Sequence, residues 1–257
     1  MIKKKKDILI IDNYQISEKK IFILKKYFKL IFLIDDKPSK KKGIDVIINS
    51  NFGIKKSFYS ERNIKKFFLG GKYKLIKDFI TNSKKKSGLT ISFGGGKVFG
   101  KIKKLLDLIF AQLIDLNYKK KINIFTNLTL NQLIQSNKIK KLNLNLQNIG
   151  PKYVPSLLSS DFCISSLGVQ HDEILKKKIP AIFVKIDNNQ NYNYLFSKKI
   201  NPDFTFDINN INKNKFSKAL KNIIQKKNRD KIIKNYKREI IGQNTFEIVE
   251  YIENNLS

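Results

Sequence analysis

Short apolar segments alternate with segments of helical apolar spacing along most of this 257-residue chain. From residue 89 onward the strand-like segments are 89–93, 121–126, 141–147, 161–165, 180–186 and 203–208. The helix-like segments that follow them are 98–116, 128–135, 154–158, 169–177, 192–197, 212–226 and 245–254. This alternation predicts a doubly wound α/β domain, a parallel sheet with helices on both faces, whose ligands bind at the carboxyl ends of the strands.

The first part of the chain shows the same alternation in a shorter form. Strand-like segments at 7–12, 30–36 and 45–50 accompany one helical segment at 17–28, and the pattern weakens between residues 52 and 81. A polar, basic connector from Asn82 to Gly88 follows. We therefore expect two Rossmann-like domains: an N-terminal one at 1–84, with too few strands to be complete, and a C-terminal one at 85–257.

Composition narrows the class of protein. Hydrophobic residues make up 41% of the chain, enough for real cores, yet no apolar run approaches the length of about 18 residues that a membrane span needs. We expect a cytoplasmic protein without a membrane partner. The only cysteine, Cys163, lies in an apolar segment and is expected in the core, and with a single histidine no metal site built from Cys or His is expected.

The formal net charge of +31 suggests a nucleic-acid partner at first sight. Arginine is the side chain best suited to bidentate phosphate and guanine contacts, but only Arg62, Arg229 and Arg238 occur among the 52 basic residues. The lysines are spread over every segment. Specific nucleic-acid binding is therefore not the expected function, and its mark would be steeply salt-dependent binding to nonspecific duplex.

Three consecutive glycines, Gly94, Gly95 and Gly96, lie where a strand passes into a helix. Free backbone N–H groups and a helix N-terminus at such a place can hold a phosphate. A tight turn without any ligand is the alternative, since glycine also serves turns that need a positive φ.

A second motif spans residues 165–190. Gly168 follows a strand, Glu173 lies on the next helix, and Asn189 and Gln190 follow the next strand. Together with the three glycines, this motif resembles the nucleotide-sugar-binding C-terminal domain of MurG-like glycosyltransferases of the GT-B fold. The resemblance implies that Gly94, Gly95 and Gly96 hold a diphosphate, that Gly168 is part of the nucleotide-binding site, that Glu173 accepts hydrogen bonds from the ribose hydroxyls, and that Asn189 and Gln190 contact the sugar or its water. The alternatives are a helix-dipole carboxylate for Glu173 and a polar turn for Asn189 and Gln190.

Segments 12–20, 34–36, 44–51 and 68–79 resemble blocks of the PseG-type hydrolases. The resemblance runs along most of residues 7–195. It implies a UDP-sugar substrate, no cofactor, and release of UDP from UDP-2,4-diacetamido-2,4,6-trideoxy-β-L-altropyranose in pseudaminic acid synthesis.

The sequence departs from that family at three places. The family's Gly-x-Gly-His-x-x-Arg segment, whose histidine is the expected base, is not in this sequence. Lys42 stands where the family has the histidine of a His-x-Cys-Asp block, and Lys77 where it has an arginine. These departures indicate a fragment, one half of a split protein whose second chain supplies the missing segment, or a relative without catalysis.

Hydrolysis of the sugar–phosphate bond requires a base for the attacking water. Asp12 and Tyr14 follow the first strand and are candidates, as is His171, the only histidine. Asp12 could instead cap a helix, and His171 could be a surface or nucleotide contact. The functions left open are a UDP-sugar hydrolase, a noncatalytic nucleotide-sugar-binding protein, and a GT-B glycosyltransferase that uses an acceptor other than water.

Overall fold

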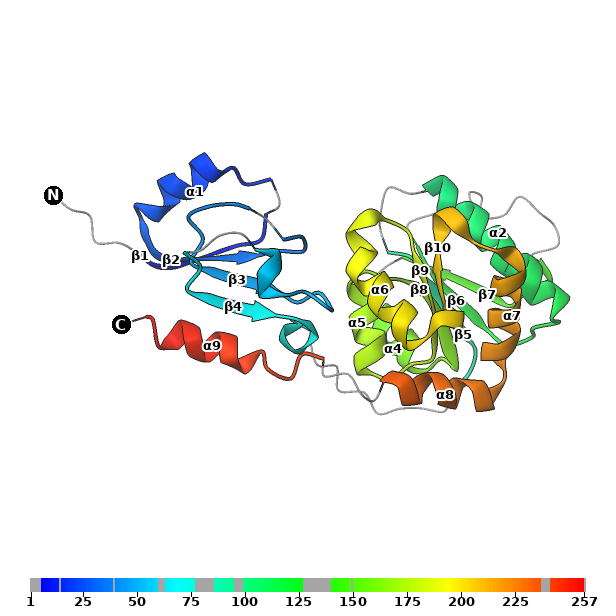
Figure 1. Cartoon of the computed structure of the whole chain (residues 1–257). Coiled ribbons are helices and arrows are strands. Elements are labelled where there is room, and N and C mark those ends of the chain that lie inside the picture. Colours follow the sequence, from blue (N-terminus) through cyan, green and yellow to red (C-terminus); the bar gives the residue numbers. More distant parts are fainter. Residues whose placement is uncertain are drawn as a thin grey trace. The chain divides into compact units, whose positions relative to one another are not determined.

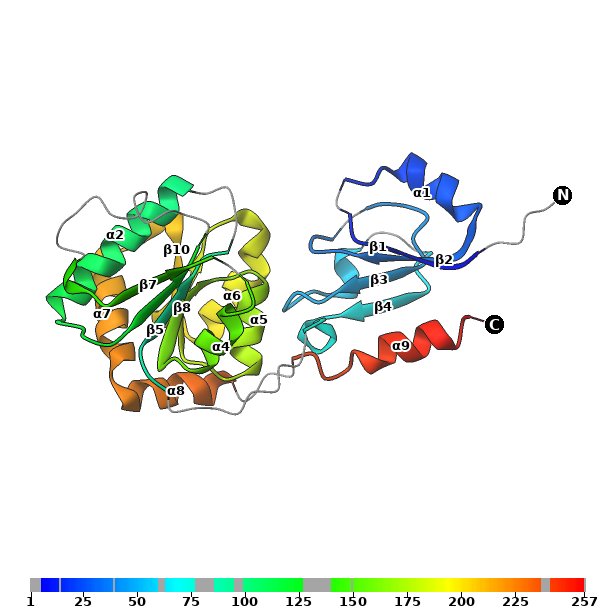
Figure 2. The same cartoon turned by 180° about the vertical axis from the view of Figure 1, so that it is seen from behind.

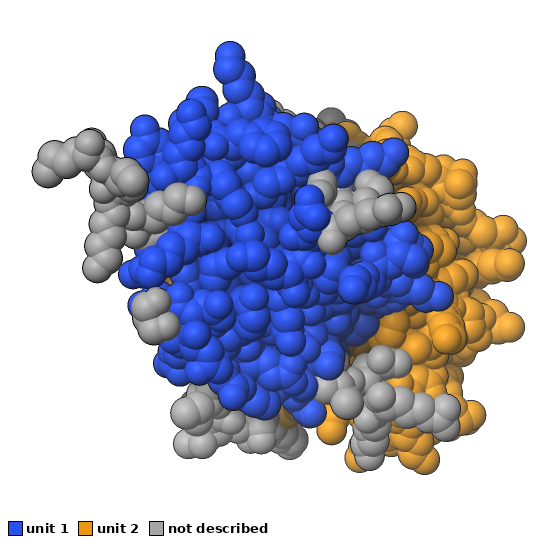
Figure 3. All heavy atoms as spheres, turned by 60° about the vertical axis from the view of Figure 1, so that its left-hand side comes forward, with its two compact units in different colours: residues 1–76, 239–257 blue, residues 77–238 orange. Residues whose placement is uncertain are grey.

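The computed structural model describes residues 6–13, 15–38, 40–59, 63–76, 86–94, 99–126, 140–148, 150–236 and 241–256. The chain divides into two compact units (Figure 3). Unit 1 combines residues 1–76 with residues 239–257, and unit 2 comprises residues 77–238.

Unit 1 contains a parallel sheet of four strands in the order β1-β2-β3-β4. The strands are β1 (Lys6–Ile11), β2 (Phe28–Ile34), β3 (Val46–Asn49) and β4 (Lys66–Leu69). Helix α1 (Glu18–Lys25) joins β1 to β2, and the 3-10 helices η1 (Lys56–Phe58) and η2 (Gly71–Tyr73) flank β4. Helix α1 covers one face of the sheet and α9 (Phe246–Glu253) covers the other (Figures 1 and 2).

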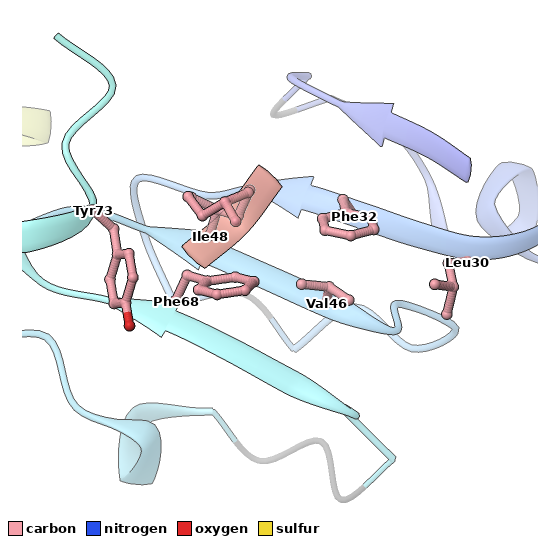
Figure 4. Close-up of a cluster of buried hydrophobic side chains, with 7 residues drawn as sticks. Leu30, Phe32, Val46, Ile48, Phe68 and Tyr73 are labelled. Atoms are coloured by element: carbon pink, nitrogen blue, oxygen red, sulfur yellow. The ribbon is translucent and has the colours of Figure 1, made fainter. Parts of the chain in front are cut away.

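The last helix, α9, completes the core of unit 1. Ile248 is buried in a cluster with side chains from β2, β3, β4 and η2, and Tyr251 and Ile252 pack against it. The members from the sheet and η2 are Leu30, Phe32, Val46, Ile48, Phe68 and Tyr73 (Figure 4). Residues 239–257 therefore belong to unit 1, whereas the sequence predicted one domain from 85 to 257. The reason is that the apolar side of α9 packs against the first sheet.

Unit 2 contains a parallel sheet of six strands in the order β10-β9-β8-β5-β6-β7. The strands are β5 (Leu89–Ser92), β6 (Ile122–Phe125), β7 (Leu144–Gln147), β8 (Phe162–Ser166), β9 (Ala181–Lys185) and β10 (Thr205–Asp207). The α-helices are α2 (Phe99–Asp115), α4 (Tyr153–Leu158), α5 (Val169–Lys176), α6 (Asn191–Ile200), α7 (Lys213–Ile224) and α8 (Lys226–Tyr236), and the 3-10 helices are η4 (Asn188–Gln190), η5 (Pro202–Phe204) and η6 (Ile208–Asn210). Helices α2 and α7 lie on one side of the sheet and α4, α5 and α6 on the other (Figures 1 and 2). This is the strand order and layering of the Rossmann fold.

Burial on both faces explains why the central strands of unit 2 read as continuous apolar runs. Every residue of β5, β6, β8 and β9 is buried. Each strand-like segment of the sequence coincides with an observed strand, and Cys163 is buried in β8 as expected. The helix expected at 128–135 lies outside the described residues. No described helix is both long and apolar enough to cross a bilayer.

Candidate functional site

Strands β5 and β8 are neighbours at the centre of the sheet of unit 2, and the chain leaves their carboxyl ends in opposite directions. It continues from β5 to β6 and β7 on one side, and from β8 to β9 and β10 on the other. In open parallel sheets this switch point is where ligands bind. Gly94 follows β5 and Gly168 follows β8, each two residues after the strand's last residue. The fold thus brings the two glycine motifs to one edge of one sheet.

Gly94 has a φ of +75°, a conformation that side-chain-bearing residues rarely adopt. A Cβ built at this position would meet no atom within 4 Å, so open space lies beside the turn. Gly95 and Gly96 lie outside the described residues. The turn leads toward α2, which begins at Phe99.

Gly168 is the N-cap of α5, with φ −85° and ψ −150°, and no side chain caps this end of the helix. Residues other than glycine can also adopt this backbone conformation. A Cβ at Gly168 would lie 3.9 Å from the amide nitrogen Nε2 of Gln190, at ordinary contact distance. The first turn of α5 therefore begins without the side-chain oxygen that usually accepts from a helix's first N–H groups.

Glu173 lies in the second turn of α5, one residue beyond Asp172, which is the acidic residue of the first turn. Its side chain is half-buried, and within the described part of the chain no donor or cation pairs with its carboxylate. Burial raises the pKa of Glu173, and the neighbouring Asp172 raises it further. A half-buried carboxylate of this kind has acceptor capacity to spare for a ligand's hydroxyls.

His171 has no exposed surface. Its Nδ1 lies 2.9 Å from Oδ1 of Asp172 and its Nε2 lies 2.7 Å from Oγ of Ser197, and its ring packs edge-on against Phe183. The Asp–His–Ser order resembles that of a hydrolytic triad, but Ser197 is also fully buried, on α6. Both ring nitrogens have partners in the interior, so the observed arrangement ties α5 to α6 and offers no open nitrogen to a water molecule.

Gln190 and Asn189 follow β9, as the sequence indicated, but their surroundings differ. Gln190 is buried, and its Oε1 accepts a hydrogen bond from the backbone N–H of Ile186 at 2.9 Å. Asn189 is exposed, and its backbone N–H donates to Oδ1 of Asp187 at 3.3 Å. The side-chain oxygen of Gln190 thus holds the turn after β9, while no hydrogen bond joins the Asn189 side chain to another described residue.

Asp12 follows β1 in unit 1 and is exposed. It does not cap the helix after it: the N-cap of α1 is Ser17, whose Oγ accepts from the backbone N–H of Lys20 at 3.3 Å. Tyr14 lies outside the described residues. Asp12 and His171 belong to different units, so neither unit by itself brings the expected catalytic residues together.

Sequence reasoning missed a cavity of about 450 Å³ at the carboxyl end of β7. It is lined by Gln147, Asn148, Gly150, Pro151 and Lys152. The Oε1 atom of Gln147 is buried and has no hydrogen-bond partner among the described residues. The position of these residues directly after the strand at 141–147 was the signal that could have found the cavity, because strand ends at this edge carry ligands.

The hydroxyl of Tyr153, at the start of α4, is buried, and its only nearby polar partner among the described residues is the side chain of Ser165, at poor hydrogen-bond geometry. Burial raises its pKa, Cys163 and the Glu173 carboxylate raise it further, and Ser165 lowers it. Tyr153 thus places a buried hydroxyl near Glu173. Among the described residues, no group of three His, Cys, Asp or Glu side chains is arranged to hold a metal ion.

The sequence matches no family model and no curated protein sequence. Solved structures do match. MurG of Acinetobacter baumannii superposes with a TM-score of 0.59 at 12% identity over 92% of this chain and 70% of MurG. A mutant of TarM from S. aureus, solved with UDP among its ligands, gives a TM-score of 0.62 at 14% identity over 96% of this chain and 55% of TarM.

WaaG, a glycosyltransferase involved in lipopolysaccharide biosynthesis, gives a TM-score of 0.56 at 9% identity over 95% of this chain and 84% of WaaG. This chain therefore has the fold of the GT-B glycosyltransferases, two parallel sheets with interspersed helices. It spans little more than half the length of TarM.

Proposed function

We propose that unit 2 binds a UDP-sugar at the carboxyl ends of β5 and β8, and that the protein hydrolyses this substrate and releases UDP. The observation that carries the proposal is the convergence of Gly94, Gly168 and Glu173 at the switch point of a Rossmann-type sheet. The resemblance to PseG-type hydrolases and the fold shared with TarM, a protein solved with UDP, support it.

Each part of the nucleotide has a matching feature. The turn at Gly94 and the uncapped N-terminus of α5 offer backbone N–H groups to the diphosphate. The Glu173 carboxylate accepts hydrogen bonds from the two ribose hydroxyls, because each of its two oxygens can accept one of them. The cavity beside Gln147 takes the base, whose N–H group would pair with the unsatisfied Oε1.

The chemistry proposed is displacement at the anomeric carbon: water attacks and gives its proton to a base, for which Asp12 is the proposed group, the bond to the diphosphate oxygen breaks, and UDP leaves. The N–H groups of the Gly94 turn stabilise the charge that develops on the departing diphosphate. We propose that Asp12 and Tyr14 contact the sugar or the attacking water. The side-chain amide of Asn189 is proposed to hydrogen-bond to the same groups. The diacetamido-trideoxy sugar and a second chain that supplies the family's histidine segment belong to the same proposal and rest on the resemblance alone.

Calorimetric titration with UDP tests the site. We expect Glu173→Gln to weaken UDP binding about 10- to 100-fold, because a charge-assisted pair of hydrogen bonds becomes a neutral one. The matched control is Glu250→Gln, the same substitution on an exposed residue of α9, which should bind UDP like the unaltered protein. Absence of UDP binding at millimolar concentration would overturn the proposal.

Release of UDP from the pseudaminic-pathway UDP-sugar tests the reaction. Turnover that is lost in Glu173→Gln supports the hydrolase. UDP binding without turnover would instead support the alternatives, a noncatalytic nucleotide-sugar-binding protein or a chain that needs its partner. UDP release that depends on an added acceptor would identify a glycosyltransferase.

A further inference from the structure

One side chain bridges the ends of the two central strands at the proposed site. Gln170, in the first turn of α5, donates from Nε2 to Oγ of Ser92 at 2.8 Å. Its Oε1 accepts from Oγ of Ser165 at 3.2 Å. Both serines are buried, with about 1% of their surfaces exposed, and they are direct register partners where β5 and β8 pair.

The two bridged serines lie directly before the two turns of the site. Ser92 precedes Gly94 by two residues, and Ser165 precedes Gly168 by three. The bridge also comes from the helix that carries Glu173. One amide thus joins the turn proposed for the diphosphate to the helix proposed for the ribose, and both ends of the amide are used.

We infer that Gln170 is a positioning residue that fixes the spacing between the Gly94 turn and the carboxylate of Glu173. This inference rests on the proposed function. Its physical basis is that a ligand spanning two subsites binds tightly only when the subsites are held at the right separation beforehand. A ligand that occupies one subsite gains nothing from that spacing.

Replacement by leucine removes the bridge without adding a charge. We expect Gln170→Leu to weaken UDP binding about tenfold, since two hydrogen bonds of ordinary strength are lost. Uridine, which lacks the diphosphate, and inorganic pyrophosphate, which lacks the nucleoside, should each keep their affinity within about twofold. A general loss of structure would instead weaken all three ligands together.

Gln112→Leu is the matched control. Gln112, on α2, also accepts a hydrogen bond from a serine hydroxyl, that of Ser217 on α7, but it lies away from the two turns. It should leave the affinities for UDP, uridine and pyrophosphate unchanged. Equal UDP affinity for Gln170→Leu and the unaltered protein, or an equal loss for all three ligands, would overturn the inference.

A ligand-free measurement separates this inference from the proposed function. Amide hydrogen exchange at Phe93, Gly94 and Gly168 should speed up several-fold in Gln170→Leu but not in Gln112→Leu. In Gln170→Glu both serine hydroxyls can donate to the carboxylate, so slow exchange should be retained. Absence of UDP binding by the unaltered protein would refute the proposed function, and unchanged exchange in Gln170→Leu would refute the bridge.

Discussion

The position of the Glu173 carboxylate lowers the stability of the folded chain when the carboxylate is ionised. It is half-buried beside the buried Asp172, without a compensating cation among the described residues, and its pKa is raised by burial and by that neighbour. A group held in this way is less favourable charged in the folded chain than in the unfolded one. Retention of such a group is typical of a site that acts on a ligand.

The sign of this effect is testable. The pKa of Glu173 is higher in the folded chain than in the unfolded chain, so the folded chain binds the proton more tightly. The contribution of Glu173 to stability therefore falls as the pH rises through the range between the unfolded and the folded pKa. We therefore expect Glu173→Gln to unfold at a higher urea concentration than the unaltered protein at pH 7, with the difference shrinking toward pH 4. A variant less stable than the parent at pH 7 would contradict this account.

His171 gives the opposite prediction at the residue scale. His171→Leu leaves Asp172 and Ser197 without their buried partner, and the free energy of unfolding should fall by about 2 kcal/mol. Urea unfolding at pH 7 measures the loss, and the folded fraction should still bind UDP. A variant of unchanged stability that binds UDP but has lost turnover would instead restore His171 as a candidate base.

At the scale of secondary-structure elements, the sequence did not reveal that α9 packs on the first sheet. Its apolar side covers the face of the first sheet that carries Phe32, Val46 and Phe68 (Figure 4). The helix also holds η2, because Oη of Tyr73 hydrogen-bonds to the carboxylate of Glu247 at 2.5 Å. Burial of one sheet face therefore depends on a helix that comes from the other end of the chain.

Ile248→Ala should destabilise unit 1 by about 3 kcal/mol, the usual cost of truncating a buried isoleucine to alanine. Hydrogen exchange should accelerate in β2, β3 and β4 and stay unchanged in β5 and β8. Val249→Ala, one residue further on the same helix but 53% exposed, is the control and should have little effect. Equal effects of the two substitutions would contradict the packing described for α9.

For the whole molecule, the charge of +31 acts against compactness. Like charges spread over the chain repel one another, and salt screens them, with a Debye length of about 10 Å at 0.1 M. We expect the melting temperature to rise as NaCl is increased from about 20 mM to about 300 mM, at constant pH. Differential scanning calorimetry measures it, and a fall in melting temperature would mean that attractive ion pairs outweigh the repulsion.

The strands of unit 2 were predictable from sequence because the central ones, β5, β6, β8 and β9, are buried on both faces and read as short, mostly apolar segments between polar turns. β4 escaped prediction because it has four residues, begins at Lys66 and lies at the edge of its sheet. The placement of α9 could not be read either, since an amphipathic helix does not specify which apolar surface it will cover.

For the candidate site, the positions of Gly94, Gly168 and Glu173 beside the ends of β5 and β8 could be predicted, because glycine and a carboxylate after apolar strand segments are visible in the sequence. Their role in ligand binding is part of the proposal. The bridge made by Gln170 could not be predicted, since a glutamine in a helix carries no local sign of the two hydroxyls that it bridges. The interior position of His171 was also invisible, because its partner Ser197 is 26 residues away along the chain.

Unit 1 combines residues 1–76 with residues 239–257, and the residues between them in the sequence form unit 2. A ribosome delivers the N-terminus first, so every strand of the first sheet emerges long before the helix that covers it. Residues 77–238 can complete their own sheet in the meantime. The newly made chain therefore carries an uncovered apolar sheet face until residues 246–253 have emerged, and removal of α9 would leave that face exposed.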